Sequence, residues 1–124
     1  MGKLVGKNRI RGVYMEEQII SMKSDFFKAL AHPTRVRILE RLAKSEEDVC
    51  VCELIEDFGI EQSNLSQHLS ILRKQHLIES TKVGLKVMYR VKYPEVLTIL
   101  EKVQEILAQQ FREGEALMKH LAKR

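Results

Sequence analysis

The stretch from residue 50 to residue 77 constrains the fold more than any other, because it predicts two short helices separated by a tight turn. Apolar residues recur at helical spacing on both sides of that turn: Val51, Leu54, Ile55, Phe58, Leu65, Leu69 and Leu72. Gly59 lies where the first helix must end, since glycine readily takes the left-handed conformation that terminates a helix. Two helices joined by a short glycine-containing turn form a helix-turn-helix unit.

The exposed side of the second helix is expected to be polar and basic. Its residues include Ser63, Asn64, Ser66, Gln67, Arg73 and Lys74. Residues 61–90 contain five basic and two acidic residues, whereas residues 40–57 contain two basic and seven acidic ones. Positive charge gathered on and after this helix suits contact with DNA phosphates, so the pattern favours a DNA-binding surface. An ordinary solvated surface is the alternative for this cluster taken alone.

A chain of 124 residues supports one domain with a modest core, and we expect that domain to span residues 15–124. Residues 1–14 contain four basic residues and no acidic one. They account for the whole net charge of +4, because the other 17 basic and 17 acidic residues cancel. These residues predict a basic flexible arm, which either adds nonspecific affinity for DNA or is only a floppy tail.

The sequence also indicates the cellular compartment of the protein. No apolar run is long enough to span a membrane, and no apolar segment follows the basic N-terminus as a secretory signal would require. Both cysteines lie in one Cys-Val-Cys triplet, so no disulfide framework is predicted. We therefore expect a cytoplasmic protein in a reducing environment.

Two helices are predicted before the helix-turn-helix unit. The first spans residues 15–31 and ends at His32 and Pro33, because the residue before proline avoids helical angles. The second opens at Pro33 or Thr34 and runs to about Lys44. An acidic loop follows it, and its carboxylates suit the N-terminus of the next helix.

A hairpin and a long helix are predicted after the unit. Residues 78–82 and 86–91 are rich in β-forming types and flank Gly84, which indicates a short basic hairpin, or wing. The last helix runs over residues 94–121 and carries a long apolar stripe. A domain this small cannot cover the whole stripe, so we expect a second subunit to cover it. Burial within the chain's own core is the alternative.

Three segments together resemble the bacterial ArsR/SmtB family of winged-helix regulators. They are KALAHPTRVRILERL (residues 28–42), VCVCELIEDFGIEQSNLSQHLSILRKQHLIES (49–80) and YRV (89–91). The resemblance covers about residues 20–93 and implies a mainly α winged helix-turn-helix with about five helices and a β-hairpin. It also implies a homodimer formed by the first and last helices, here residues 15–31 and 94–121. Such a repressor binds a pseudo-palindromic double-stranded operator until a ligand lowers its affinity.

Seven residues are candidates for contact with DNA. Hydroxyl and amide side chains can read base edges, and here these are Ser63, Asn64, Ser66 and Gln67. Longer cations suit phosphates, and here these are Arg73, Lys82 and Lys86.

Glu61 and His68 also belong to the second helix of the helix-turn-helix unit, the one after Gly59. Glu61 stands where members of the family often have serine; its carboxylate suits the helix dipole but repels phosphate, so an altered contact is expected. His68 lies beside the buried Leu69, and we favour packing or phosphate contact over metal ligation because no second ligand has suitable spacing.

Cys50 and Cys52 form the sharpest chemical hypothesis. In the arsenite- and cadmium-responsive members that the sequence resembles, a Cys-Val-Cys element at this place supplies thiolate ligands, and soft thiolates suit As(III) and Sb(III). Residues two apart on a helix point about 200° apart, so convergence of both sulfurs on one atom is expected to distort the helix start and displace the reading helix. The third ligand is unknown, because the chain has no third cysteine. Burial as two small apolar side chains is the structural alternative.

Three other functions compete with that hypothesis. A redox switch would use the same pair, through a disulfide between Cys50 and Cys52 or through reaction with persulfide. An enzyme is not expected, because the chain lacks a Cys-x-x-Cys pair, a phosphate-binding glycine loop and a usable Cys–His set. An adaptor without DNA binding is disfavoured by the basic reading helix and wing. No resident cofactor is expected, and no metal site on the last helix, where His120 is the lone histidine.

Overall fold

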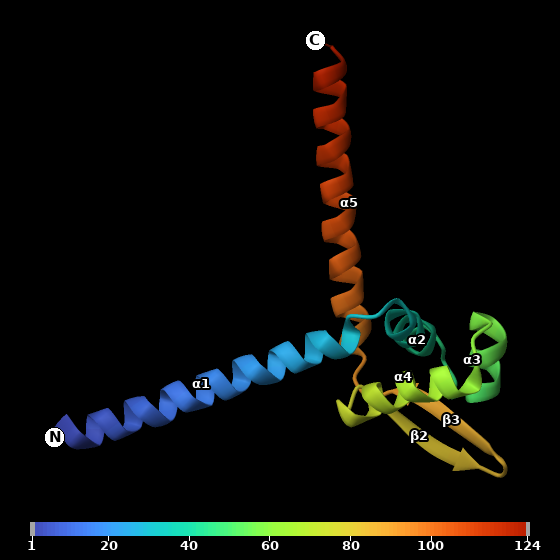
Figure 1. The fold of residues 1–124 in the computed structure, drawn as a ribbon, viewed down its shortest axis with the longest axis horizontal. Helices are drawn as coiled ribbons and strands as arrows, with labels where there is room; N and C mark the ends of the chain where they lie inside the picture. The colour runs from blue at the N-terminus through green and yellow to red at the C-terminus, as the bar shows by residue number, and fades with distance from the viewer. Residues whose placement is uncertain (1, 124) are drawn as a thin grey trace.

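The computed structural model describes residues 2–123, with side chains from residue 10 onward. Within that range the chain forms five helices and three strands (Figure 1). They are α1 (Gly2–Leu30), α2 (Pro33–Ala43), β1 (Val49–Cys50), α3 (Val51–Phe58), α4 (Gln62–Lys74), β2 (Ile78–Val83), β3 (Lys86–Val91) and α5 (Glu95–Ala122). This confirms the predicted winged helix-turn-helix of about five helices with a β-hairpin.

The elements divide into a compact body and two projecting helices. Figure 1 shows α2, α3, α4 and the strands gathered together, while α1 and α5 leave that body in different directions and carry the two ends of the chain. None of the helices in residues 2–123 has the length and apolar content needed to cross a membrane.

The first helix begins earlier than the sequence predicts. It starts at Gly2 rather than at Met15, so the described part of the predicted arm continues α1; Met1 lies outside the described residues. The early glycines suggested a break, yet glycine destabilises a helix by only about 1 kcal/mol per residue relative to alanine and keeps the hydrogen-bond ladder. No proline precedes Pro33 to interrupt it.

The turn of the helix-turn-helix unit forms as predicted. Gly59 ends α3 with φ +61° and ψ +33°, and its N–H donates to the carbonyl of Ile55. Few residues other than glycine adopt this left-handed conformation without strain. The chain then enters α4 after Ile60 and Glu61.

The sheet has one strand that the sequence does not predict. Its order is β1-β3-β2, and the two-residue β1 pairs antiparallel with β3, placing Val49 opposite Tyr89 and Cys50 opposite Met88. Strands β2 and β3 form the predicted hairpin, with Gly84 at φ +63° in its two-residue turn. A strand of two residues is too short to show an alternation of apolar and polar side chains in the sequence. It can be recognised only from its pairing with β3.

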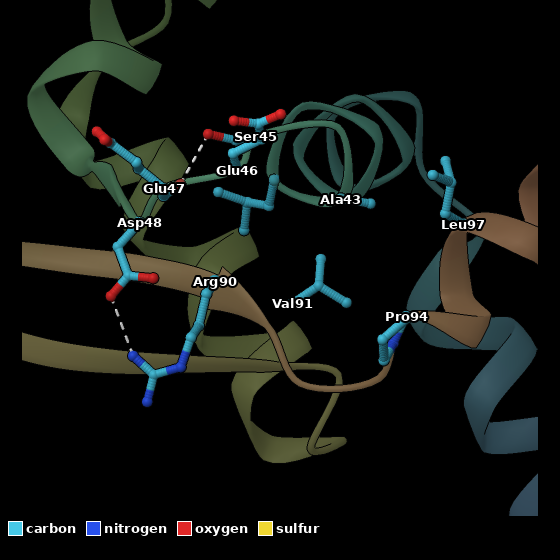
Figure 2. Close-up of a pocket in the computed structure, with 10 residues that line it drawn as sticks. Ala43, Ser45, Glu46, Glu47, Asp48, Arg90, Val91, Pro94 and Leu97 are labelled. Carbon is cyan, nitrogen blue, oxygen red and sulfur yellow. Dashed lines mark hydrogen bonds and ion pairs between the residues drawn. The ribbon is translucent and has the colours of Figure 1, made fainter.

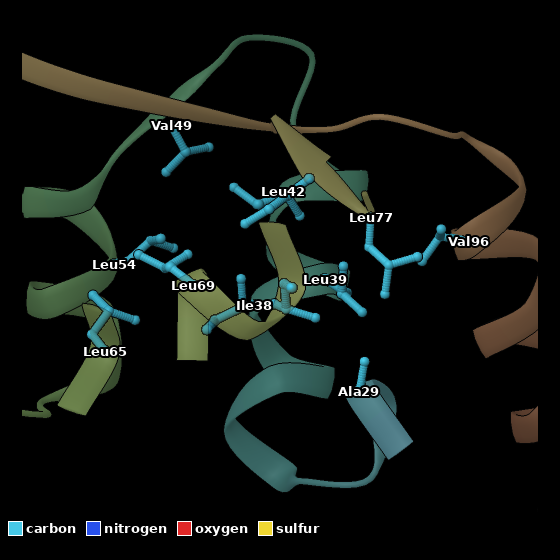
Figure 3. Close-up of a cluster of buried hydrophobic side chains, with 12 residues drawn as sticks. Ala29, Ile38, Leu39, Leu42, Val49, Leu54, Leu65, Leu69, Leu77 and Val96 are labelled. Atoms are coloured by element: carbon cyan, nitrogen blue, oxygen red, sulfur yellow. The ribbon is translucent and has the colours of Figure 1, made fainter. Parts of the chain in front are cut away.

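The core lies where α2, α3, α4 and the sheet meet (Figure 3). Its fully buried large side chains are Ile38, Leu39, Val49, Leu54, Leu65, Leu69, Leu72, Leu77 and Ile78. Each such side chain contributes about 1.5–3 kcal/mol of hydrophobic stabilisation. Ala29 and Val96 join this core from α1 and α5, so each long helix is fixed to the body near one end only.

The outer parts of both long helices keep large apolar side chains exposed. On α1 these are Ile10, Val13, Tyr14, Met15, Ile19, Ile20, Met22 and Phe27. On α5 they are Val103, Ile106, Leu107, Phe111, Leu117, Met118 and Leu121. Apolar surface on this scale is typical of an interaction site rather than of a finished monomer surface.

Leu39→Ala should lower the free energy of unfolding by about 3 kcal/mol, because it removes packed methyl groups and leaves a cavity in the core. Leu39 is 0% exposed, whereas Leu85 at the hairpin tip is 100% exposed. Leu85→Ala, the matched control, should change stability by less than about 0.5 kcal/mol. Urea unfolding at one fixed protein concentration measures both values, and equal losses would contradict this description of the core.

Candidate nucleic-acid interface and cysteine pair

Burial sorts the residues of α4 into two sides. Leu65, His68, Leu69 and Leu72 face the core and are buried. The predicted base-reading residues Ser63, Asn64, Ser66 and Gln67 are all exposed on the other side. The helix therefore presents short polar side chains to solvent over its first two turns, backed by packed leucines.

The start of α4 lacks a side-chain cap. Glu61 occupies the N-cap position in an extended conformation, with φ −66° and ψ 145°, and its carboxylate accepts no capping hydrogen bond. Serine, aspartate or asparagine at an N-cap usually accepts one from the backbone N–H groups of the first turn. Glu61 is exposed, so its negative charge lies at the same end of α4 as the predicted base-reading residues.

The predicted phosphate ligands lie at the end of α4 and on the wing. Arg73 Nη1 donates to Ser80 Oγ at 3.4 Å, which connects α4 to β2. Lys82 and Lys86 are exposed near the hairpin tip, where Lys82 pairs with Val87 and Val83 pairs with Lys86. Because side chains alternate along strands and share a face across a pair, this register directs the two lysines to opposite faces of the hairpin. The tip of the hairpin therefore carries one lysine on each of its two faces.

Arg90 has a structural role that the sequence does not reveal. Its Nη1 contacts Asp48 Oδ2 and Thr81 Oγ1, each at 3.1 Å, and its Nε contacts Glu79 Oε2 at 3.1 Å. The guanidinium therefore joins the acidic loop before β1 to strand β2. Arg90 is one of the five basic residues in 61–90, but the carboxylates of Asp48 and Glu79 compensate its charge.

A hollow of about 280 Å³ lies beside this ion pair (Figure 2). Its walls come from the end of α2, the acidic loop, the end of β3 and the start of α5. Asp48 and Arg90 stand at one wall of it, and Ser45 Oγ donates to the carbonyl of Glu47 at 2.7 Å. Among the described residues, no group of three or more His, Cys, Asp and Glu side chains could hold a metal ion.

The cysteine pair lies where β1 passes into α3. Cys50 is the N-cap of α3, extended at φ −70° and ψ 143°, and its Sγ accepts from the N–H of Cys52 at 3.2 Å. The two residues are joined by a disulfide, with their Cα atoms 5.1 Å apart. Cys50 is only 4% exposed, whereas Cys52 is exposed at the surface.

This geometry corrects the expected link between sulfur convergence and helix distortion. The angle of about 200° applies to two residues that both lie on a helix. Cys50 instead has strand-like angles and precedes the first helical residue, Val51. The two sulfurs therefore meet while α3 keeps its first turn, and their convergence by itself does not unwind the helix.

The pair has two structural neighbours through which it can act. Cys50 pairs with Met88 of β3, so it is attached to the wing, and it begins α3, the first helix of the helix-turn-helix unit. Arg41 Nε contacts Asp57 Oδ2 at 3.1 Å and ties α3 to α2. The sulfurs therefore lie next to both the first turn of α3 and a strand of the wing.

The comparisons with known proteins agree with this geometry. The family model described as "Bacterial regulatory protein, arsR family" matches residues 32–80. The HTH-type transcriptional regulator Rv0081 of Mycobacterium tuberculosis is 37% identical over 106 residues, which cover 85% of this chain and 91% of that protein. The chain belongs to the arsR family. It is thus a DNA-binding transcriptional regulator rather than an enzyme, as predicted.

Three similar proteins show how far the similarity extends. The crystal structure of M. tuberculosis Rv0081 has a TM-score of 0.69 and 38% identity, covering 77% of this chain and 94% of that one. The SmtB homologue of Synechocystis, named a transcriptional repressor, is 36% identical over 68% of this chain and 62% of that protein. The arsenical resistance operon repressor of Staphylococcus xylosus is 36% identical over 56% of this chain and 65% of its own length.

Glu61→Ser should raise the free energy of unfolding by about 0.5–1 kcal/mol, because serine can cap α4 where glutamate does not. It should also increase affinity for DNA, since a negative charge is removed from the exposed start of α4. Urea unfolding measures the first effect, and fluorescence anisotropy on a duplex selected from a random pool measures the second.

The variant Glu61→Gln is the control, because it removes the same charge without supplying a good cap. It should increase DNA affinity as serine does while slightly lowering the free energy of unfolding, because the favourable interaction of the carboxylate with the helix dipole is lost. Equal stability of the serine and glutamine variants would show that the position does not act as a cap.

Proposed function

We propose that this protein is a homodimeric repressor that binds a pseudo-palindromic operator and releases it when As(III), Sb(III) or a similar thiophilic ion binds Cys50 and Cys52. The observation that carries the proposal is the convergence of both sulfurs at the junction of β1 and α3. That junction touches the wing through β3 and begins the helix-turn-helix unit. The protein would act in the reducing cytoplasm.

Contact with DNA is assigned to the exposed side of α4 and to the wing. Ser63, Asn64, Ser66 and Gln67 would enter the major groove, where each base pair presents a distinct pattern of donors and acceptors. Arg73, Lys82 and Lys86 would contact phosphates and fix the register of the protein on the duplex. Their exposure supports these roles.

The homodimer is supported by the apolar surface of the two long helices. In a single chain, large side chains such as Met22, Phe27, Phe111 and Leu117 stay exposed along α1 and α5. A two-fold interface buries the same patch on both subunits, and it places two α4 helices for two half-sites. The operator would accordingly be pseudo-palindromic.

The cysteine pair has the chemistry of a soft-ion site. Cys52 is exposed and gives the ion access, while the N–H of Cys52 points at Cys50 Sγ and favours a thiolate at the N-terminus of α3. Two protein thiolates would bind in the reduced state, and water or a small thiol would complete the coordination of As(III). The arsR-family member from Staphylococcus xylosus is named an arsenical resistance operon repressor, which supports a thiophilic inducer.

Ligand binding and operator binding would oppose each other through one conformational equilibrium. An ion held between the sulfurs changes the spacing of Cys50 and Cys52. Since α3 starts between the two cysteines and Cys50 pairs with Met88, this change in spacing would alter the orientation of α3 and the position of β3. Both elements support DNA contacts, so a small displacement of either weakens the operator complex.

A second candidate keeps the same repressor but switches it by thiol oxidation or by persulfide at the same pair. The disulfide between Cys50 and Cys52 favours it specifically, because this bond is the oxidised state that such a switch requires. The reduced dithiol and the disulfide would then be the two states with different affinity for the operator.

The test is a titration of the reduced protein with arsenite while operator affinity is followed by fluorescence anisotropy at stated salt. Affinity should fall steeply near one equivalent per subunit. The double variant Cys50→Ser/Cys52→Ser should bind the operator normally and no longer release it, because serine at residue 50 can still cap α3. Release by mild oxidation without any response to arsenite would favour the redox switch, and loss of operator binding in the variant would make the cysteines structural.

Lys86→Ala should reduce the slope of log affinity against log salt by about 0.9, because one phosphate contact and its released counterion are lost. Lys82→Ala should do the same. The control is Lys102→Ala, since Lys102 is exposed on α5 and pairs with Glu105 at 3.2 Å, away from the wing. If the slope of log affinity against log salt is unchanged in both wing variants, neither lysine contacts a DNA phosphate, and the wing is not part of the interface.

A further inference from the structure

The buried side of the reading helix carries a polar cluster that the proposed function does not use. His68 is 8% exposed and is the one buried polar or charged residue among the described side chains. It lies between two of the leucines that hold α4 on the core. Burying a polar ring in such a place is unfavourable unless the ring is hydrogen-bonded.

Arg35 of α2 supplies that hydrogen bond and two more. Its Nη1 lies 3.2 Å from His68 Nδ1, its Nε donates to the carbonyl of Ala29 at 2.6 Å, and its Nη2 donates to the carbonyl of Lys28 at 3.3 Å. One planar guanidinium thus spans from the last turn of α1 to the middle of α4. The two carbonyls are among those that a helix C-terminus leaves without intrahelical partners.

The contact with Arg35 defines the protonation of the His68 ring. A guanidinium has only donors, so Nδ1 of His68 must be the acceptor, and a neutral ring then carries its proton on Nε2. His32 lies against the same ring, with 4.2 Å between the ring centroids. Its own Nδ1 accepts from the N–H of Thr34 at 3.1 Å and caps α2.

We propose that Arg35 and His68 form a positioning link that orients the DNA-reading helix on the end of α1, and that protonation of His68 breaks this link and weakens DNA binding in mild acid. The proposal rests on the reading role of α4. It assigns a function to two residues that lie outside the proposed set of DNA contacts and outside the cysteine pair.

Protonation breaks the link for a geometric reason. It places a hydrogen on Nδ1, which then points a donor at the Arg35 donor, so the hydrogen bond is lost and two cations face each other. The groups that face the ring are unfavourable to a second positive charge: α2 contributes the Arg35 guanidinium and the His32 ring, and α1 contributes carbonyls that Arg35 already occupies. Among the side chains that the structure describes, the polar and aromatic partners of His68 are Arg35 and His32, and neither is a carboxylate.

The surroundings also determine the pH range of the effect. Burial, then the neighbouring His32 and Arg35, lower the pKa of His68 from its ordinary value of 6.5. In the unfolded chain the ring takes up its proton at the ordinary value, so the unfolded state binds more protons than the folded state just below it. The contribution of neutral His68 to stability is therefore complete above about pH 6.5 and is lost as pH falls toward the lower pKa of the folded state.

The link matters because α1 and α4 serve different partners. The outer part of α1 carries the apolar surface assigned to the second subunit, while α4 faces DNA. In a dimer the separation and tilt of the two reading helices must match half-sites about one helical turn of DNA apart. A guanidinium that fixes the end of α1 to the middle of α4 transmits the dimer geometry to the reading side.

The experiment compares DNA affinity of the wild type and His68→Asn between pH 5 and pH 8 at constant ionic strength. The Oδ1 atom of asparagine can accept from Arg35 as Nδ1 does, but it does not titrate. Relative to His68→Asn, the wild type should lose affinity several-fold as the pH falls below 6.5, while both bind similarly at pH 8. The ratio removes the pH effects that the two proteins share, and parallel pH profiles would overturn the proposal.

Two further measurements test the proposal if His68→Asn folds poorly. Nitrogen NMR shifts of the wild-type ring should show the Nε2-protonated form at pH 7.5 and a pKa below 6.5; a proton on Nδ1 at that pH would overturn the proposal. Arg35→Lys keeps the charge but cannot make three divergent hydrogen bonds, so it should weaken DNA binding at every pH and flatten the profile. A wild type that binds no DNA at any pH would instead refute the reading role of α4.

Discussion

Burial of the inner side of α4 is the constraint on which the rest of the structure depends. Leu65, Leu69 and Leu72 pack against the core, and this alone decides that the short polar residues between them face solvent. The left-handed turn at Gly59 then directs α4 across α3, and Arg73 ties its end to the wing through Ser80. The proposed reading surface is thus the outer side of a helix whose inner side could not be exposed without losing the core.

The same core explains why α1 and α5 behave differently from the other helices. Each contributes only one end to the body, through Ala29 and Val96, and leaves most of its apolar surface uncovered. The small body has no further surface on which to bury it. In the proposed homodimer a second subunit would cover this surface, and Arg35 would connect that interface to α4, because its guanidinium holds the end of α1 and the His68 ring together.

The cysteine pair illustrates how a local sequence argument can fail on one backbone angle. Spacing on an ideal helix separates the side chains of residues 50 and 52, yet the structure extends the backbone at Cys50 and pairs it with β3. The two-residue strand β1 exists only because β3 lies beside it, so no pattern within residues 49–52 could reveal it. The connection of the thiols to the wing is therefore a tertiary fact, and in the proposed switch it takes the place of helix unwinding as the route of the signal.

The sequence by itself determined the order of the elements, the helix-turn-helix unit, the wing and the exposed polar side of α4, because apolar periodicity, glycine and proline act locally. It misplaced the start of α1, because three glycines before residue 15 suggested a break although this segment contains no proline. Only the tertiary structure decided the partners of Arg35, His68 and Arg90, which lie far apart in the chain. Hydrogen bonds between distant segments depend on how the core brings helices together, and periodicity along one segment carries no information about that.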